Sequence, residues 1–294
     1  MVLTPEPGAL AGRVIAVTGA GRGLGRSHAL LLAAHGARVV VNDVDEAPAS
    51  EAVAEIEAGG GEAVASVGAI DTPAGGAAVV DRAIEAFGRI DGLVNNAGIL
   101  RDAAFHKMTD DDWHDVISVH VHGAWYPTRA AWPRFREQEY GRVVFTTSHA
   151  GLFGNFGQAN YSAAKMALLG LASTLAIEGR SSGIGVNVIA PLAASRLGVS
   201  AGIASALDRL DPEPVSALVG WLCSPACHST GAVVGAAGGR YQAYRIAEGP
   251  CLSLEEPDLE EVGACWDELD DLGSPTLPTL ESFQRLLGAE PDAR

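Results

Sequence analysis

The sequence predicts an α/β fold in which a doubly wound parallel sheet of seven strands carries helices on both faces. Short apolar runs alternate with longer helical patterns, and this alternation favours a parallel sheet that is covered on both sides. The composition, 48% hydrophobic and 19% charged over 294 residues, is sufficient for a large core. Strands are expected at residues 13–18, 37–42, 62–67, 91–94, 141–146, 184–190 and 232–236, and helices at 23–35, 46–58, 74–87, 110–137, 157–180 and 211–223.

The first strand and the first helix enclose a glycine-rich turn that is typical of a dinucleotide site. The sequence Thr-Gly-Ala-Gly-Arg-Gly-Leu-Gly occupies residues 18–25, and the next apolar run ends at Asn42 and Asp43. Glycines let the backbone approach a pyrophosphate, and the free N–H groups at a helix N-terminus attract it. A glycine turn without a ligand is the alternative, which the strands, the helix and the acid together disfavour. We therefore expect a Rossmann-like sheet with a cofactor site at Gly19, Arg22, Gly23, Leu24 and Gly25.

Two residues of this unit bear on the choice of nucleotide. Asp43, at the tip of the second strand, would accept hydrogen bonds from the adenosine ribose and repel a 2′-phosphate. Arg22, in the glycine turn, could reach that phosphate. An exposed guanidinium recovers at most about 1 kcal/mol, which is less than the repulsion from a carboxylate. The sequence therefore predicts NAD as the cofactor.

Tyr161, Lys165 and Ser148 predict alcohol–ketone chemistry. Tyr161 and Lys165 are four residues apart on a predicted helix, so they share one face. A neighbouring ammonium favours the phenolate and is expected to lower the pKa of Tyr161, which suits the phenol for proton transfer with an alcohol. Ser148, upstream, can hydrogen-bond the same substrate oxygen.

Further candidate residues lie where the predicted strands end. Asn96, Ala97 and Gly98 follow the strand at 91–94, and ligands bind at the carboxyl ends of strands in such sheets. Pro191 follows the sixth strand and begins a loop of small residues that could order over a substrate.

Three basic residues are weaker candidates. Arg101 and Arg196 follow strand ends and could meet an anionic substrate, with a solvated loop arginine as the equal alternative for each. His120 could face the site, although a lone histidine on an apolar helix is more often a packed or surface residue.

Charge and composition define two regions. The formal charge is −16, which argues against nucleic acid as a partner. Residues 251–294 hold twelve acids and two arginines, a net of −10, which leaves −6 for the first 250 residues. We expect a catalytic domain at 1–245 and an acidic C-terminal extension at 246–294.

No run is long enough to span a membrane, no signal peptide is visible, and no metal site is expected. Four cysteines without zinc or redox spacing are expected to be reduced thiols in the cytoplasm.

In this order and spacing the motifs resemble those of the classical short-chain dehydrogenases/reductases. The matching pieces are the glycine turn, the Asn-Asn-Ala-Gly at 95–98, Ser148 and the Tyr161-x-x-x-Lys165 pair. Residues 154–160 and 175–180 further resemble the (3R)-hydroxyacyl-CoA dehydrogenase domain of peroxisomal multifunctional β-oxidation enzymes and its bacterial single-domain relatives.

The resemblance implies roles for individual residues. Tyr161 would be the acid/base, Lys165 would hold the nicotinamide ribose and keep the Tyr161 pKa low, and Ser148 would polarise the substrate oxygen. Gly19, Gly23 and Gly25 would shape the pyrophosphate site, Asn96 to Gly98 would flank the adenosine ribose, and Asp43 would select NAD.

The chain departs from the family pattern at three places. His120 stands where most members have asparagine, although the narrower subfamily resembles this chain there. Ala69 stands where the usual adenine-contacting acid would be, and Ile70, which follows it, is expected at the cofactor site. Leu192 replaces the glycine after Pro191.

We expect an NAD-dependent oxidoreductase that interconverts a secondary alcohol and a ketone, with a 3-hydroxyacyl-CoA as substrate and a steroid-derived acyl group as one variant. A hydroxysteroid dehydrogenase and a ketoacyl carrier-protein reductase are the alternatives. A catalytically idle NAD-binding assembly protein is the alternative of another class, and the intact Ser148, Tyr161 and Lys165 disfavour it. The resemblance implies a homotetramer, or a homodimer, built through the helices at 110–137 and 157–180.

Overall fold

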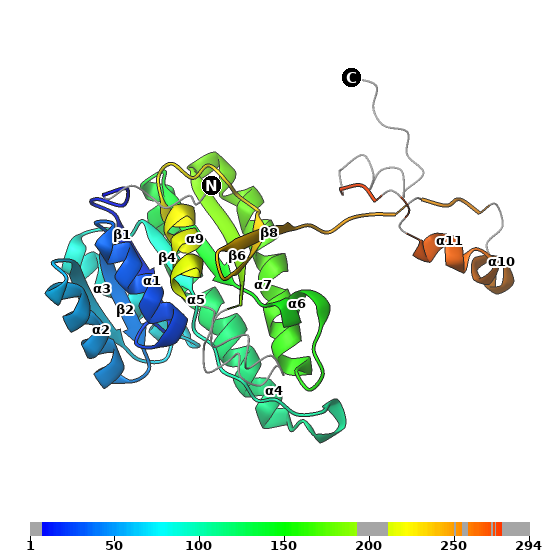
Figure 1. The fold of residues 1–294 in the computed structure, drawn as a ribbon, viewed down its shortest axis with the longest axis horizontal. Helices are drawn as coiled ribbons and strands as arrows, with labels where there is room; N and C mark the ends of the chain where they lie inside the picture. Colours follow the sequence, from blue (N-terminus) through cyan, green and yellow to red (C-terminus); the bar gives the residue numbers. More distant parts are fainter. Residues whose placement is uncertain are drawn as a thin grey trace. The chain divides into compact units, whose positions relative to one another are not determined.

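One eight-stranded sheet organises the larger part of the chain (Figure 1). The computed structural model describes residues 8–192, 211–249, 251–254, 258–271, 273 and 275–277. The chain divides into two compact units, Met1–Ala243 and Tyr244–Arg294. The sheet order is β3-β2-β1-β4-β5-β6-β7-β8, and neighbouring strands from β1 to β7 pair in parallel. The strands are β1 (Val14–Val17), β2 (Arg38–Asp43), β3 (Glu62–Val67), β4 (Gly92–Asn95), β5 (Gly141–Thr146), β6 (Ile184–Leu192), β7 (Val233–Ala237) and β8 (Arg240–Tyr244).

The predicted α/β class is confirmed, but the predicted count of seven strands is one short. Only Gly238 and Gly239 separate β7 from β8, and both have positive φ. Two such glycines form a tight hairpin turn, so β8 runs back antiparallel along β7. The Gly-Gly pair was the available signal for this edge strand.

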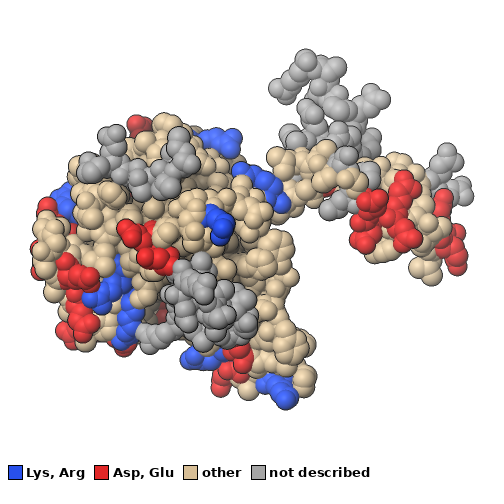
Figure 2. Space-filling model, viewed as in Figure 1, with Lys and Arg blue, Asp and Glu red and all other residues tan. Residues whose placement is uncertain are grey.

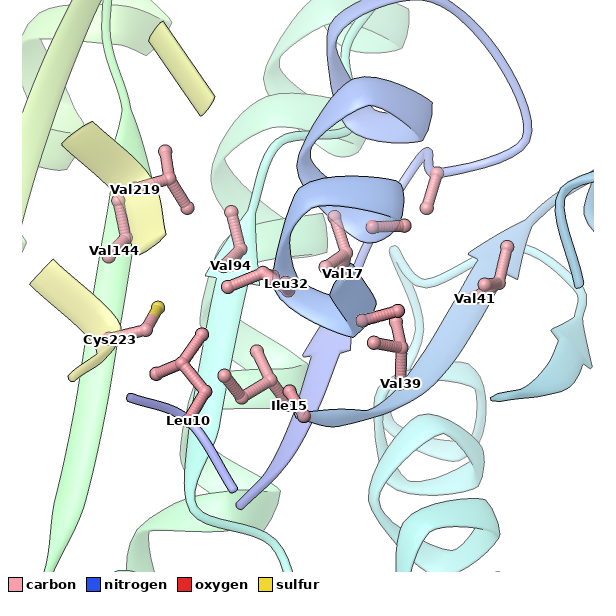
Figure 3. Packing of buried hydrophobic residues seen from close by; sticks show 14 of the residues in the cluster. Leu10, Ile15, Val17, Leu32, Val39, Val41, Val94, Val144, Val219 and Cys223 are labelled. Atoms are coloured by element: carbon pink, nitrogen blue, oxygen red, sulfur yellow. The ribbon is translucent and has the colours of Figure 1, made fainter. Parts of the chain in front are cut away.

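Helices cover both faces of the sheet, as expected. The first core lies on the side of α1, α2 and α9, and the second core lies on the side of α3, α5 and α7 (Figures 1 and 3). Alternate residues of β1 supply both cores, because side chains alternate across a strand. The first core includes Ile15, Val17, Leu32, Val219 and Leu222, and the second includes Val14, Ala16, Phe135, Phe145 and Leu168. The helices are α1 (Gly23–Ala34), α2 (Glu46–Ala58), α3 (Pro73–Phe87), α4 (Asp110–Ile117), α5 (Gly123–Glu137), α6 (His149–Phe153), α7 (Ala159–Glu178), α9 (Glu213–Cys223), α10 (Leu259–Ala264) and α11 (Trp266–Asp270), with short 3₁₀ turns η1 (Phe105–Lys107) and η3 (Arg180–Ser182).

The helix expected at 110–137 is interrupted. A π-helical turn, η2 (Ser118–His122), separates α4 from α5. A π turn places one extra residue in the helix and is frequently found at functional sites. The apolar pattern of the sequence continues across it, so helical periodicity alone did not reveal the break. The short helix α6 was also missed, because five residues carry too little periodicity.

Strand β6 is longer than expected and includes Pro191. The pairing of β5 with β6 ends at Ile189, whereas the pairing of β6 with β7 continues through Pro191 to Leu192. Proline is tolerated here because β6 has only one partner strand at this point. Pro191 and Leu192 therefore belong to β6 and not to the expected loop, whose residues 193–200 lie outside the described residues.

The second unit has little secondary structure among its described residues. It contains α10, α11 and an antiparallel bridge between Glu248 and Thr276. Acidic side chains gather on the α10 and α11 segment (Figure 2). Within the described part of the whole chain, no helix is both long and apolar enough to cross a membrane.

We expect the stability of the fold to fall between pH 6.5 and pH 3 because of His28. This side chain lies fully buried between α1 and α9, with Nδ1 2.8 Å from Ser216 Oγ. Burial lowers its pKa to about 3. The unfolded chain therefore binds this proton more readily, so the stabilisation is complete above about pH 6.5 and is lost as the pH falls. At pH 5 the free energy of unfolding should be about 2 kcal/mol lower than at pH 7 from this residue alone.

Denaturant unfolding of His28→Gln at both pH values tests this expectation. The neutral amide should reduce the difference between pH 7 and pH 5 by about 2 kcal/mol. His106→Gln, at an exposed position, is the matched control. An unchanged pH difference in His28→Gln would exclude His28 as the cause.

Candidate active site

The glycine turn after β1 adopts the conformation that its sequence suggests. Gly19 has φ +61° and Gly23 has φ +53°, a left-handed backbone that favours glycine. Gly25 is required for a different reason, since a Cβ there would overlap Gly19 O and the side-chain nitrogen of Asn96. The first two glycines therefore shape the turn, and the third lets α1 pack against it.

Two side chains join the glycine turn to the loop after β4. Thr18 Oγ1 accepts hydrogen bonds from the backbone N–H groups of Asn96 and Ala97, at 3.0 and 3.2 Å. In return, Asn96 Nδ2 donates to Thr18 O and Gly19 O, at 3.0 and 3.2 Å. The side chain of Asn96 is thus used to hold the turn. Thr18, which is fully buried, was not assigned a role from the sequence, although a threonine between the apolar run and the glycine turn was the available signal.

Asp43 lies beside the glycine turn, at the end of β2. Its Oδ2 accepts a hydrogen bond from Gly21 N at 3.0 Å, and its Oδ1 accepts one from Asp45 N at 3.1 Å. The residue is only 7% exposed. Each carboxylate oxygen keeps a free lone pair, which can accept a hydrogen bond from a ribose hydroxyl.

The side chains of other residues predicted to bind the cofactor are wholly or partly buried. Leu24 packs against the first core, and Ile70 is buried in the second. The side chain of Ile70 is therefore covered, whereas that of Leu24 is half-buried. Pro191 is half-buried near the end of β6, and Gly98 lies against the ring of His120.

The structure brings Ser148, Tyr161 and Lys165 together. Ser148 follows β5 and caps α6, where its Oγ accepts a hydrogen bond from Ala150 N at 3.2 Å. Tyr161 and Lys165 lie on one side of α7, and Lys165 Nζ is 5.6 Å from the centre of the Tyr161 ring. Lys165 is buried and donates to Thr146 O at 2.6 Å.

The expected depression of the Tyr161 pKa is wrong for the chain by itself. Burial raises the pKa of Tyr161, a hydrogen bond with Ser148 opposes this rise, and the negative charge of Asp102 adds to it. Burial also lowers the pKa of Lys165 to about 7. Loss of water is the main cause of both shifts, because burial disfavours the charged form of each group.

His120 packs directly against Tyr161. It lies buried in the π turn, with its ring 5.2 Å from the Tyr161 ring and nearly perpendicular to it. Its Nε2 lies 2.8 Å from Ile99 O and 3.1 Å from Ile99 N. Burial first, and then the positive charge of Lys165, lower the pKa of His120 well below its usual value. His120 is therefore a neutral ring that contacts Tyr161 and anchors the loop after β4.

Asn160, like His120, holds the surroundings of Tyr161 in place. From the sequence it was included only as part of the motif at residues 154–160. Its Nδ2 donates to Arg101 O and Asp112 O, both at 3.0 Å, and its Oδ1 accepts from Tyr161 N at 2.7 Å. This fully buried amide fixes the start of α7 against α4 and the neighbouring loop. A polar residue directly before the tyrosine was the available signal.

Arg101, one of the two arginines considered for an anionic substrate, does not enter this cluster. The Arg101 side chain is exposed, and its Nε lies 3.5 Å from Asp115 Oδ2. Arg196 lies outside the described residues.

The arrangement can transfer a proton between Tyr161 and an alcohol oxygen. The glycine turn and Asp43 follow β1 and β2, while Ser148 follows β5, so all lie at the carboxyl edge of one parallel sheet (Figure 1). This edge is where doubly wound sheets bind their ligands.

Comparisons with known proteins agree with this architecture. The family model described as short chain dehydrogenase matches residues 13–196. A short-chain type dehydrogenase/reductase of Mycobacterium tuberculosis is 46% identical over 270 residues, which cover 88% of this chain and 94% of that protein. Peroxisomal multifunctional enzyme type 2 of Mus musculus is 47% identical over 229 residues, which cover 75% of this chain but 31% of the mouse protein.

A solved structure extends the agreement to three dimensions. The crystal structure of a short chain dehydrogenase from Mycobacterium avium superimposes with a TM-score of 0.82 at 39% identity, over 92% of this chain and 98% of that one. Members of this family are oxidoreductases that act on CH–OH groups and use NAD or NADP. This chain belongs to the short-chain dehydrogenase family.

Proposed function

We propose that the protein is an NAD-dependent oxidoreductase that interconverts a secondary alcohol and a ketone, with a 3-hydroxyacyl-CoA as its substrate. The observation that carries this proposal is the cluster of Ser148, Tyr161 and Lys165 on the same sheet edge as the glycine turn and Asp43.

The chain's own groups supply binding and proton transfer. Ser148 holds the substrate oxygen, and Tyr161 removes its proton when the alcohol is oxidised. Asp43 binds the adenosine ribose, the glycine turn binds the pyrophosphate, and Lys165 binds the nicotinamide ribose. NAD supplies the acceptor for the hydride. Among the described residues, buried Lys165 donates to one acceptor, Thr146 O, so its other protons can serve a ligand.

The substrate proposal rests on the resemblance to the (3R)-hydroxyacyl-CoA dehydrogenase domain, which covers the motifs around Tyr161. A free hydroxysteroid is the second candidate. A ketoacyl carrier-protein reductase is weaker, because such reduction commonly draws on the phosphorylated nucleotide, which Asp43 disfavours.

NAD reduction with a panel of alcohols tests the function. The panel contains (3R)- and (3S)-hydroxyacyl-CoA of several chain lengths, free hydroxysteroids, and a ketoacyl carrier protein with NADPH. The highest kcat/KM is expected for a (3R)-hydroxyacyl-CoA. Preference for a free steroid or for the carrier protein would replace the substrate proposal. No turnover of any alcohol or ketone would favour the idle assembly protein.

We expect the enzyme to prefer NAD over NADP by at least about tenfold in kcat/KM. A 2′-phosphate about 4 Å from the Asp43 carboxylate would be repelled by roughly 4 kcal/mol at an effective dielectric near 20. The Arg22 side chain is 44% exposed and can return only about 1 kcal/mol. Asp43→Ser should narrow this preference. Comparing kcat/KM for both nucleotides in the two proteins decides the matter, and equal use of NADP by the wild type would contradict the role of Asp43.

We also propose a homotetramer, or a homodimer, in which a partner subunit covers the outer face of α5 and α7. A hollow of about 340 Å³ lies on this face, and Trp125 in it is 42% exposed. Phe135, Leu168 and Leu169, on the same two helices, fill the second core instead. An arginine and a glutamate in the hollow suit a self-complementary contact. The lining residues are Trp125, Thr128, Arg129, Trp132, Pro133, Leu175 and Glu178.

Light scattering of the full chain tests the assembly. A tetramer of the 30.2 kDa chain should scatter as a particle of about 120 kDa. Trp125→Glu should shift the population to smaller species, whereas Trp266→Glu, an exposed tryptophan of the second unit, should not. A monodisperse monomer of the wild type at micromolar concentration would refute the oligomer.

A further inference from the structure

Arg22 and Asp45 form an ion pair between two turns that flank Asp43. Arg22 Nη1 lies 2.8 Å from Asp45 Oδ2. Arg22 is the N-cap residue of α1, Asp45 is the N-cap residue of α2, and neither side chain caps its own helix. An N-cap aspartate usually accepts a hydrogen bond from the first turn of its helix. The Asp45 carboxylate makes no such hydrogen bond and contacts the Arg22 guanidinium instead.

The pair lies next to the carboxylate expected to select the nucleotide. Asp43 accepts one hydrogen bond from Gly21, the neighbour of Arg22, and one from the backbone of Asp45 itself. A Cβ on Gly21 would come within 2.7 Å of both Asp43 Oδ2 and Pro48 Cβ, so the two turns are in close contact. Any group bound at Asp43 therefore lies close to both members of the pair.

A purely structural role for this pair is poorly supported. Arg26 already joins α1 to α2 through Glu55, with Nε 2.9 Å from Oε2. The Arg22 and Asp45 side chains are about half exposed, and such a pair contributes little to stability. The pair determines instead which charge the glycine turn presents to a ligand.

We propose that Asp45 is a second nucleotide-selectivity residue, which disfavours NADP by holding the Arg22 guanidinium. The inference rests on the proposed NAD dependence. Asp43 repels a 2′-phosphate, and Asp45 pairs with Arg22, whose guanidinium would otherwise attract that phosphate. Reversal of the preference therefore requires changes at both acids, because Asp43→Ser alone leaves Arg22 paired.

Equilibrium binding of NAD and NADP, measured by calorimetry, tests the inference without an alcohol substrate. The ratio of the two Kd values is compared in the wild type, Asp45→Asn, Arg22→Gln and the Asp45→Asn/Arg22→Gln double variant. Asp45→Asn should shift the ratio about fivefold toward NADP, the size of a released exposed pair. The double variant should have the same Kd ratio as Arg22→Gln alone, because no guanidinium remains to be released. The shift caused by Asp45→Asn should also shrink at 1 M salt, where charges are screened within about 3 Å.

Glu46→Gln is the matched control, since it removes one exposed acid from the same turn without touching Arg22. It should leave the ratio unchanged. An equal shift in Glu46→Gln would overturn the inference, as would a shift that survives Arg22→Gln. Absence of NAD binding by the wild type would overturn the proposed cofactor as well, whereas normal NAD binding with a silent Asp45→Asn would overturn the inference alone.

Discussion

Replacing Tyr161 by phenylalanine is expected to reduce kcat by about 10²-fold or more, the low end of what general acid/base catalysis contributes. The substitution removes only the phenolic oxygen that receives the proton. Phenylalanine keeps the ring that packs edge-on against His120, so the buried cluster should remain intact. Steady-state turnover with saturating alcohol and NAD measures the loss.

Two further measurements distinguish this from a general disturbance. The Kd for NAD should be nearly unchanged in Tyr161→Phe, and the unfolding transition should stay close to that of the wild type. Wild-type turnover in this variant would remove Tyr161 from the mechanism. A parallel loss of NAD binding would show that the phenol serves binding and not proton transfer.

Lys165→Met should impair both turnover and nucleotide binding. Methionine fills a similar volume but removes the charge beside Tyr161 and every hydrogen-bond donor of the group. Loss of a charged hydrogen-bond donor weakens binding by about tenfold. Loss of a preorganised charge in a buried site lowers kcat by about 10²-fold. Measurements of kcat and of the Kd for NAD should therefore both change, unlike those for Tyr161→Phe.

Lys107 provides the matched control for this substitution. It is the only other lysine of the chain, and it is exposed in η1. Lys107→Met should leave kcat and the Kd for NAD at their wild-type values. If Lys165→Met lowered kcat without weakening NAD, the proposed ribose contact would be wrong and only the electrostatic role would remain.

The parts of the fold that depend on local sequence were predictable. The glycine turn was recognisable because Gly19 and Gly23 adopt a backbone that other residues avoid, and this requirement is visible in the sequence. The alternation of strands and helices followed from apolar runs whose residues fill two cores. The pairing of Tyr161 with Lys165 followed from helical geometry, which places residues four apart on one face.

The parts that depend on tertiary environment were not predictable. The direction of the Tyr161 pKa shift was wrong because burial, which local spacing does not reveal, raises the pKa of Tyr161 and lowers that of Lys165. The contact of Arg22 with Asp45 joins two turns 23 residues apart, so no short motif contains it. The hydrogen bonds of Asn160 likewise connect segments that only the folded chain brings together.

The π turn at Ser118–His122 rotates the faces of α5 relative to those of α4 within one helical segment. An α-helix advances about 100° per residue, so one extra residue rotates everything that follows by about that angle. Before the turn, Val116 of α4 packs in a small cluster with Ala150, Tyr161 and Ala164. After it, α5 turns Ala131 and Phe135 into the second core against the sheet. A continuous helix could align only one of these two faces. The extra residue therefore lets one helical segment pack both against the cluster that contains Tyr161 and against the second core.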